Sequence, residues 1–126
     1  MMIYEMTKEF EKDLKQLTKK YQSLPEDLEN LKQYSIELFH SLNIVVPQAI
    51  VKVEGLCSDN LVIYKVRKIS CRSLKTKGAN SGLRLIYAYH VKTKAITFIE
   101  MYAKNQKSVE DKERIKKYIA KQKKEQ

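Results

Sequence analysis

Three basic residues on two predicted strands are the strongest candidates for chemistry in this sequence of 126 residues. Lys65 and Arg67 lie two residues apart in the segment LVIYKVRKI, and Arg84 lies in GLRLIYAYHV. Because side chains alternate across a strand, Lys65 and Arg67 share one face of theirs. If the more apolar face of each strand is buried, all three cations project to the same side of the sheet. Converging cations repel one another, so we expect an anionic partner, and guanidinium groups match phosphate oxygens well.

This cluster suits the binding or cleavage of a phosphodiester. RNA cleavage through the 2′-hydroxyl needs a base, charge stabilisation at the phosphate and a route to protonate the leaving oxygen. A lysine crowded by two arginines should have a lowered pKa, so Lys65 is expected to act as a base near neutral pH. Lys104, at the end of the last predicted strand, can reach the same region. No metal or cofactor is required, and Cys57 and Cys71, which lack metal-ligand spacing, are expected to remain free thiols.

The positive charge of the chain is concentrated in one segment. The formal net charge is +10, yet residues 65–94 contain nine lysines and arginines and no acid, whereas residues 1–40 contain more acids than bases. This distribution is expected of a phosphate-binding face. The basic C-terminal run is better interpreted as a solvated surface. Residues expected to hold RNA around the central cluster are Lys68, Arg72, Lys75, Lys77 and Lys107.

The elements that must position these residues follow from the hydrophobic pattern. Residues 2–6 predict a short strand, and Thr7 can cap the helix that follows. Apolar residues spaced by three and four predict two amphipathic helices joined as an antiparallel hairpin. Their stripes are Phe10, Leu14, Leu17 and Tyr21 in the first helix and Leu28, Leu31, Leu38 and Leu42 in the second. The segment 44–55 is apolar but irregular, and the pattern assigns it to no element.

The second half of the chain is strand-like. Residues 61–69, 82–91 and 95–103 are rich in β-branched and aromatic side chains and predict three strands, before a final helix that opens at residues 108–111. The order β-α-α-β-β-β-α predicts one α+β domain over residues 1–126, with an antiparallel sheet packed against a helical hairpin and a C-terminal helix. No export signal and no run of 18 apolar residues is present, which favours a cytoplasmic protein without a membrane partner.

Two motifs in this frame resemble the RelE/ParE toxin superfamily. They are Tyr64-Lys65-Val66-Arg67, followed by a basic loop, and the strand SGLRLIY at residues 81–87. The resemblance spans the element order of nearly the whole chain and implies a RelE-like fold. It further implies a toxin of a type II toxin–antitoxin system that cuts mRNA, in many members on the ribosome, and that a co-expressed antitoxin silences. In that pattern Lys65 lies near the attacking 2′-hydroxyl, Arg84 grips the scissile phosphate, and Arg67 stabilises charge there. The implied partners are a cognate antitoxin, mRNA and the ribosome.

The sequence departs from the family pattern after the last strand. RelE has an arginine just after this strand and a tyrosine close to the C-terminus, whereas this chain has Lys104-Asn105 and then Asp111. Lys104 or Lys107 can supply the charge. The proton-transfer residue is not determined, and the candidates are Glu100, Tyr102, Glu110 and His90. The alternative for His90 is a purely structural role. Tyr87 and Tyr89 are expected to be core residues.

Two other functions are compatible with the same residues. A ParE-like toxin shares the fold, lacks the basic catalytic set and inhibits DNA gyrase. An RNA-binding module would use the same basic face without cleavage and needs no proton-transfer group. All three hypotheses predict salt-sensitive association with nucleic acid or with an acidic partner.

Overall fold

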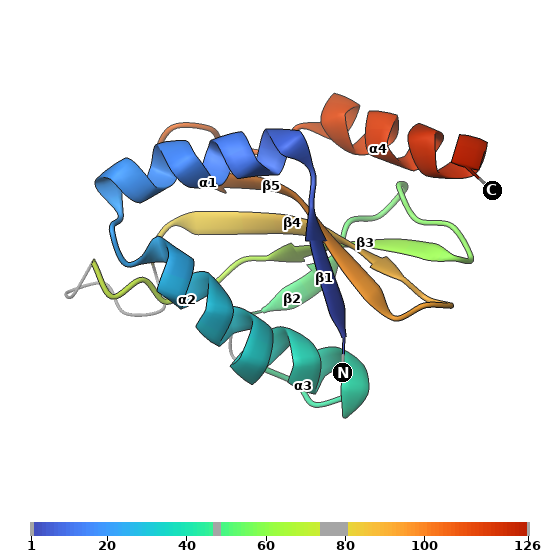
Figure 1. Cartoon of the computed structure of the whole chain (residues 1–126), viewed down its shortest axis with the longest axis horizontal. Coiled ribbons are helices and arrows are strands. Elements are labelled where there is room, and N and C mark those ends of the chain that lie inside the picture. Colours follow the sequence, from blue (N-terminus) through green and yellow to red (C-terminus); the bar gives the residue numbers. More distant parts are fainter. Residues whose placement is uncertain (1, 47–48, 74–80, 126) are drawn as a thin grey trace.

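The chain forms a five-stranded sheet with helices on both faces (Figure 1). The structure, a computed structural model, describes residues 2–46, 49–73 and 81–125. The strand order is β1-β5-β4-β3-β2, in which β1 runs parallel to β5 and the other neighbours are antiparallel. The strands are β1 (Ile3–Met6), β2 (Ile50–Lys52), β3 (Leu61–Val66), β4 (Leu83–His90) and β5 (Ala95–Ala103). The predicted α+β class is confirmed. The sheet is mixed because β1 and β5 are distant in sequence and no tight turn constrains their relative direction.

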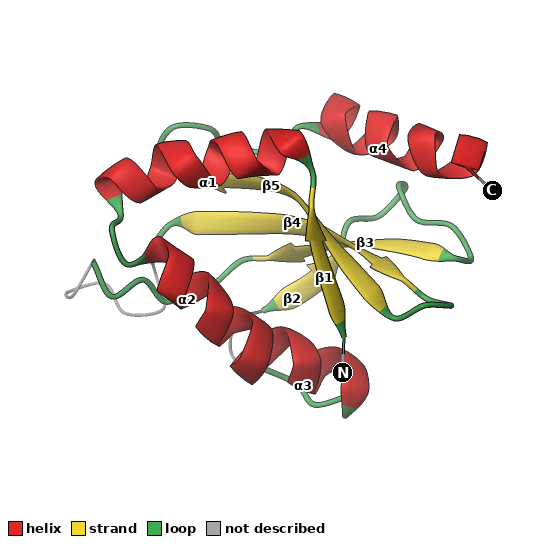
Figure 2. Cartoon of the chain, viewed as in Figure 1, coloured by secondary structure: helices red, strands yellow, loops and turns green. Residues whose placement is uncertain are grey.

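One face of the sheet is covered by the N-terminal helices, shown in red with the strands in yellow in Figure 2. These are α1 (Lys8–Lys20), α2 (Leu24–Leu31) and α3 (Glu37–Ser41), with a π-helical turn, η1 (Lys32–Ile36), between the last two. Thr7 caps α1 as predicted, since its Oγ1 accepts a hydrogen bond from the backbone N–H of Phe10 at 3.1 Å. The core on this side includes the fully buried rings of Phe10, Tyr87 and Phe98.

The second predicted helix contains a π-helical turn and ends one residue earlier than expected. Leu28 and Leu31 are buried as expected, but Ser35 and Ile36 follow them into the core. These two residues lie seven and eight positions after Leu28, which is the same helix face. The helix also ends at Ser41, and Leu42 is 62% exposed. The prediction that Leu42 continues the buried stripe is therefore wrong.

The C-terminal helix covers the opposite face of the sheet. Helix α4 (Lys112–Glu125) buries Ile115 and packs Tyr118 and Ile119 against a second apolar cluster, which confirms its predicted apolar side. The other buried members of that cluster are Val53, Leu61, Ile63, Ile86, Ala88, Ile99 and Tyr102. The helix begins one residue after Asp111, whose side chain accepts a hydrogen bond from the backbone N–H of Arg114 at 3.1 Å. Both faces of the central strands are therefore buried.

The segment that the pattern did not assign contains the edge strand β2. Ile50–Lys52 pairs antiparallel with β3, so that Val51 faces Lys65 across the ladder. Strand β3 is shorter than the predicted 61–69 and ends at Val66. Arg67 lies just beyond that end, where its backbone N–H donates to the carbonyl of Ala49 at 3.2 Å. In the part of the chain that the structure describes, no helix is long and apolar enough to cross a membrane.

Candidate functional site

Lys65 and Arg84 are neighbours on the sheet face that α4 covers. Lys65 pairs in register with Ile86 of β4, and Arg84 lies two residues before Ile86 on the same face. Diagonal neighbours of this kind are within reach of long side chains. This register confirms the prediction that the side chains of Lys65 and Arg84 lie on the same face of the sheet. The face is not a solvated one, however, because Ile63 and Ile86 belong to the cluster under α4.

Lys65 is not a free cation. Its Nζ donates a hydrogen bond of 2.9 Å to Oε1 of Glu110, and the two side chains are only 20% and 11% exposed. Burial by itself lowers the pKa of Lys65, but the hydrogen bonds and charges of Glu110 and Tyr102 outweigh burial, and the net pKa is raised. The prediction of a lysine with a lowered pKa is therefore wrong. The tertiary structure brings an acid to a segment that has none in its own sequence, and Lys65 is an ammonium at neutral pH.

Glu110 is the anionic partner in this ion pair. Burial tends to raise its pKa, but the hydrogen bond and charge of Lys65 outweigh burial and lower it. Glu110 is therefore a carboxylate at neutral pH and can accept a proton. Tyr102 lies beside this pair, opposite Arg84 in the β4–β5 register. Burial raises the pKa of Tyr102, and the hydrogen bond and charge of Lys65 oppose this effect.

Glu100 anchors the segment between β5 and α4 against this face. Its side chain is 1% exposed, and its carboxylate accepts hydrogen bonds from Lys107 Nζ and, at 2.8 Å, from the backbone N–H of Asp111. A β-bulge between Ile86 and Tyr87 makes this arrangement possible. One extra residue in β5 places both Glu100 and Thr97 on the α4 side, although an odd spacing would otherwise put them on opposite faces. The segment after β5 is thereby held where Glu110 meets Lys65.

The other predicted site residues are distributed around this pair. Arg67, Lys68 and Lys104 are exposed, and the backbone N–H of Lys104 donates to the carbonyl of Gly82, which places it close to Arg84. Lys107 is bound to Glu100 and lies 5.3 Å from the centre of the Tyr102 ring. Arg72 pairs with Glu26 and Asp27 of α2, so it belongs to the helical side of the molecule. Lys75 and Lys77 lie outside the described residues.

His90 does not belong to this cluster. It lies at the other end of β4, where its Nε2 is 2.7 Å from the hydroxyl of Tyr118 and 3.3 Å from Oγ1 of Thr97. Tyr87 is fully buried and Tyr89 packs against the core, as predicted. Cys57 and Cys71 are free thiols. Within residues 2–46, 49–73 and 81–123, no three His, Cys, Asp or Glu side chains gather in a way that could hold a metal ion.

Comparison with known proteins gives a match at the level of structure. No family model matches the sequence, and no curated protein matches it either. Among solved structures, the chain is similar to one in the crystal structure of the archaeal RelE–RelB complex from Pyrococcus horikoshii OT3. The likeness covers 83% of this chain and 97% of that chain, with a TM-score of 0.51 and 16% sequence identity. The protein therefore has a RelE-like fold.

Proposed function

We propose that this protein is the toxin of a toxin–antitoxin pair and that it is an endoribonuclease acting on mRNA. The observation that carries the proposal is the cluster of Lys65, Arg84 and the ionised Glu110 on one face of a RelE-like fold. The solved neighbour is a RelE–RelB complex. By that analogy, this chain would have an antitoxin as its protein partner. The targets that we propose, mRNA and the ribosome, follow from the resemblance of residues 64–67 and 81–87 to RelE/ParE toxins.

The side chains of this cluster support a complete route for RNA cleavage. The Glu110 carboxylate accepts the proton of the 2′-hydroxyl, whose oxygen attacks the adjacent phosphorus. Arg84 binds the non-bridging oxygens as their charge grows, with Arg67 and Lys104 at the rim. The bond between phosphorus and the 5′-oxygen then breaks, and the Lys65 ammonium protonates that oxygen. The products are a 2′,3′-cyclic phosphate and a 5′-hydroxyl. Every step uses a side chain, so cleavage is expected to persist in EDTA.

Cleavage of a labelled RNA, with and without translating ribosomes, tests this function. Wild-type protein is expected to produce new 5′-hydroxyl ends, and Arg84→Ala should slow cleavage by about 10²- to 10³-fold. Arg72→Ala is the matched control, because that arginine pairs with α2 and should leave cleavage nearly unchanged. Full activity in Arg84→Ala would contradict the phosphate-binding role. Gyrase inhibition without RNA cleavage would support the ParE-like alternative instead.

One observation favours a second candidate, RNA binding without cleavage. The Lys65 ammonium is held by Glu110, and in this geometry the carboxylate competes with a phosphate for the same cation. A chain that binds RNA on this face and releases no cleaved ends, with or without ribosomes, would have this second function.

A further inference from the structure

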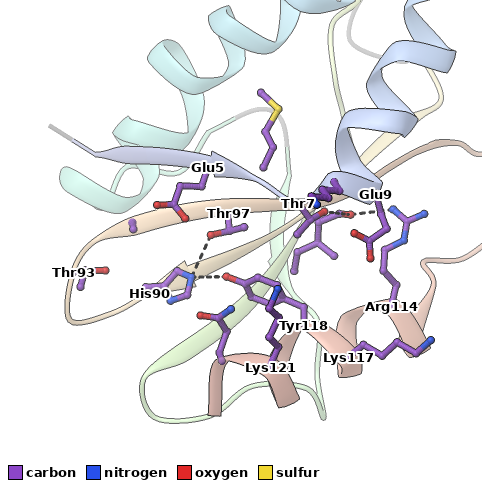
Figure 3. A pocket seen from close by; sticks show the side chains of 15 residues that line it. Glu5, Thr7, Glu9, His90, Thr93, Thr97, Arg114, Lys117, Tyr118 and Lys121 are labelled. Carbon is purple, nitrogen blue, oxygen red and sulfur yellow. Dashed lines mark hydrogen bonds between the residues drawn. The ribbon is translucent and has the colours of Figure 1, made fainter. Parts of the chain in front are cut away.

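A pocket outside the Lys65 cluster lies between β1, the start of α1 and α4 (Figure 3). It has a volume of about 590 Å³, within the range of small-molecule sites and larger than a bare phosphate needs. Glu5 of β1, Thr97 of β5 and His90 of β4 line the sheet side. Lys117, Tyr118 and Lys121 line the helix side. Because His90 and Arg84 are six residues apart on β4, their backbone positions are about 20 Å apart along the same sheet face.

His90 and Tyr118 provide uncharged polar groups inside this pocket. In Figure 3 the imidazole reaches toward both the Tyr118 hydroxyl and Thr97, at the distances given above. Burial lowers the pKa of His90, although the charge of Glu5 opposes this effect. The imidazole is therefore mostly neutral at pH 7, and the pair can both donate and accept hydrogen bonds.

The rim of the pocket is positively charged. Lys117 and Lys121 lie four residues apart on α4, so they share a helix face, and both are exposed. Neither forms an ion pair with any side chain that the structure describes. Arg114, by contrast, binds Asp13 at 2.6 Å and serves as a wall of the pocket. The charged residues that line the pocket are the cations Lys8, Arg114, Lys117 and Lys121 and the carboxylates Glu5 and Glu9.

We infer that this pocket binds one phosphorylated nucleotide, either free or as one residue of an RNA strand. The phosphate would meet Lys117 and Lys121, which lack a carboxylate partner among the described residues. The base and sugar would meet His90 and Tyr118, whose hydrogen-bonding groups suit an uncharged polar ligand. Ala95, which is partly exposed, adds a small apolar surface to the lining. The inference does not require RNA cleavage, because no residue of the Lys65 cluster lines this pocket.

Titration with AMP, followed by NMR of the imidazole signals, tests this inference. The chain has two histidines, so each ring can be assigned, and His40, which packs among Tyr64, Tyr87 and Tyr89 on the other sheet face, is the internal reference. AMP is expected to shift the His90 signals saturably and to leave those of His40 in place. At the same ionic strength, adenosine should bind about tenfold more weakly than AMP. Absence of a saturable His90 shift, or equal binding of adenosine and AMP, would overturn the inference.

Substitutions on α4 separate a defined site from general attraction to a basic protein. Lys117→Gln and Lys121→Gln should each weaken AMP binding by about fivefold. Lys116→Gln, on the same helix but outside this pocket, should change it by less than about twofold. Equal weakening in all three variants would overturn the site. A 5′-phosphorylated tetranucleotide that displaces AMP would assign the nucleotide to an RNA strand, and one that does not would assign it to a free nucleotide. Arg84→Ala, which tests the proposed cleavage, should leave the AMP-induced shift of the His90 signals unchanged, because Arg84 does not line the pocket.

Discussion

The ammonium nitrogen of Lys65 lies 2.9 Å from Oε1 of Glu110, a residue 45 positions later in the chain. This contact reverses the protonation state that the sequence suggests for Lys65, which was expected to be an uncharged base. Lys65 is held as the charged acid, and Glu110 as the charged base. Any RNA that enters the cluster must therefore interact with an ion pair, and the two charges contribute in opposite directions to binding a phosphate.

Replacing Glu110 should separate RNA binding from cleavage. Glu110→Gln removes a carboxylate that competes for Lys65, so RNA affinity should rise by about threefold. The same change removes the proposed base, so the single-turnover cleavage rate should fall by about 10²-fold or more. Filter binding and quench-flow measurements provide the two values. Glu113→Gln, an exposed acid on α4, is the control and should change neither. An unchanged cleavage rate in Glu110→Gln would exclude this residue as the base.

The ion pair should also be visible in the free energy of unfolding. Lys65→Met and Glu110→Gln should each lower it by about 1–3 kcal/mol, because each leaves a largely buried charge without its partner. The double variant should lose about 1–2 kcal/mol less than the sum of the two. Urea unfolding of the four proteins measures this coupling. The exposed pair Lys116–Glu113 on α4 should show a coupling below about 0.5 kcal/mol. Strict additivity at Lys65 and Glu110 would contradict the pair's stabilising role.

His40 should make the protein less stable in mild acid. Burial lowers its pKa from 6.5 to about 4, and its Nε2 lies 2.7 Å from the Tyr87 hydroxyl. The unfolded chain therefore binds a proton between pH 6.5 and pH 4 that the folded chain does not. The contribution of His40 to the free energy of unfolding is complete above pH 6.5 and is lost as the pH falls toward 4. Solvent around the half-buried ring reduces its size to about 1–2 kcal/mol.

Urea unfolding at pH 7 and pH 5 checks this pH dependence. Burial lowers the pKa of both histidines, but the shift is large at His40. His40→Gln should therefore flatten the dependence of the unfolding free energy on pH in that interval more than His90→Gln does. A wild-type profile that is flat between pH 7 and pH 5 would contradict the burial of a neutral His40.

The attachment of α4 should depend on one ion pair to α1. Arg114 donates hydrogen bonds to Asp13 Oδ2 at 2.6 Å and to the carbonyl of Ile99 at 3.0 Å. Asp13→Asn should lower the free energy of unfolding by about 1–2 kcal/mol and speed amide hydrogen exchange in α4 more than in β4. Glu11→Gln, an exposed acid of the same helix, is the control. Equal exchange rates in α4 of Asp13→Asn and wild type would show that apolar packing alone holds the helix.

Most of the fold could be predicted from local pattern. Strand β5 and the start of α1 were predicted within a residue, because alternation in a strand and a threonine cap are encoded in neighbouring residues. Leu42 was placed wrongly, since the helix ends one residue before it and nothing in the apolar spacing marks that end. Strand β2 was missed because three residues at a sheet edge carry too short a pattern to recognise.

The candidate site divides in the same way. Strand periodicity predicted that Lys65 and Arg84 share a sheet face, on the premise that each strand buries its more apolar face, and the register of β3 with β4 confirms the shared face. The sequence also indicated that this part of the chain is basic. Only the tertiary structure decided the charge environment of Lys65, because Glu110 lies on the segment after β5. The bulge in β5 and the hydrogen bond from Asp111 to Glu100 hold that segment beside Lys65. A pKa depends on the charges that surround a group in space, and distance along the chain does not determine those charges.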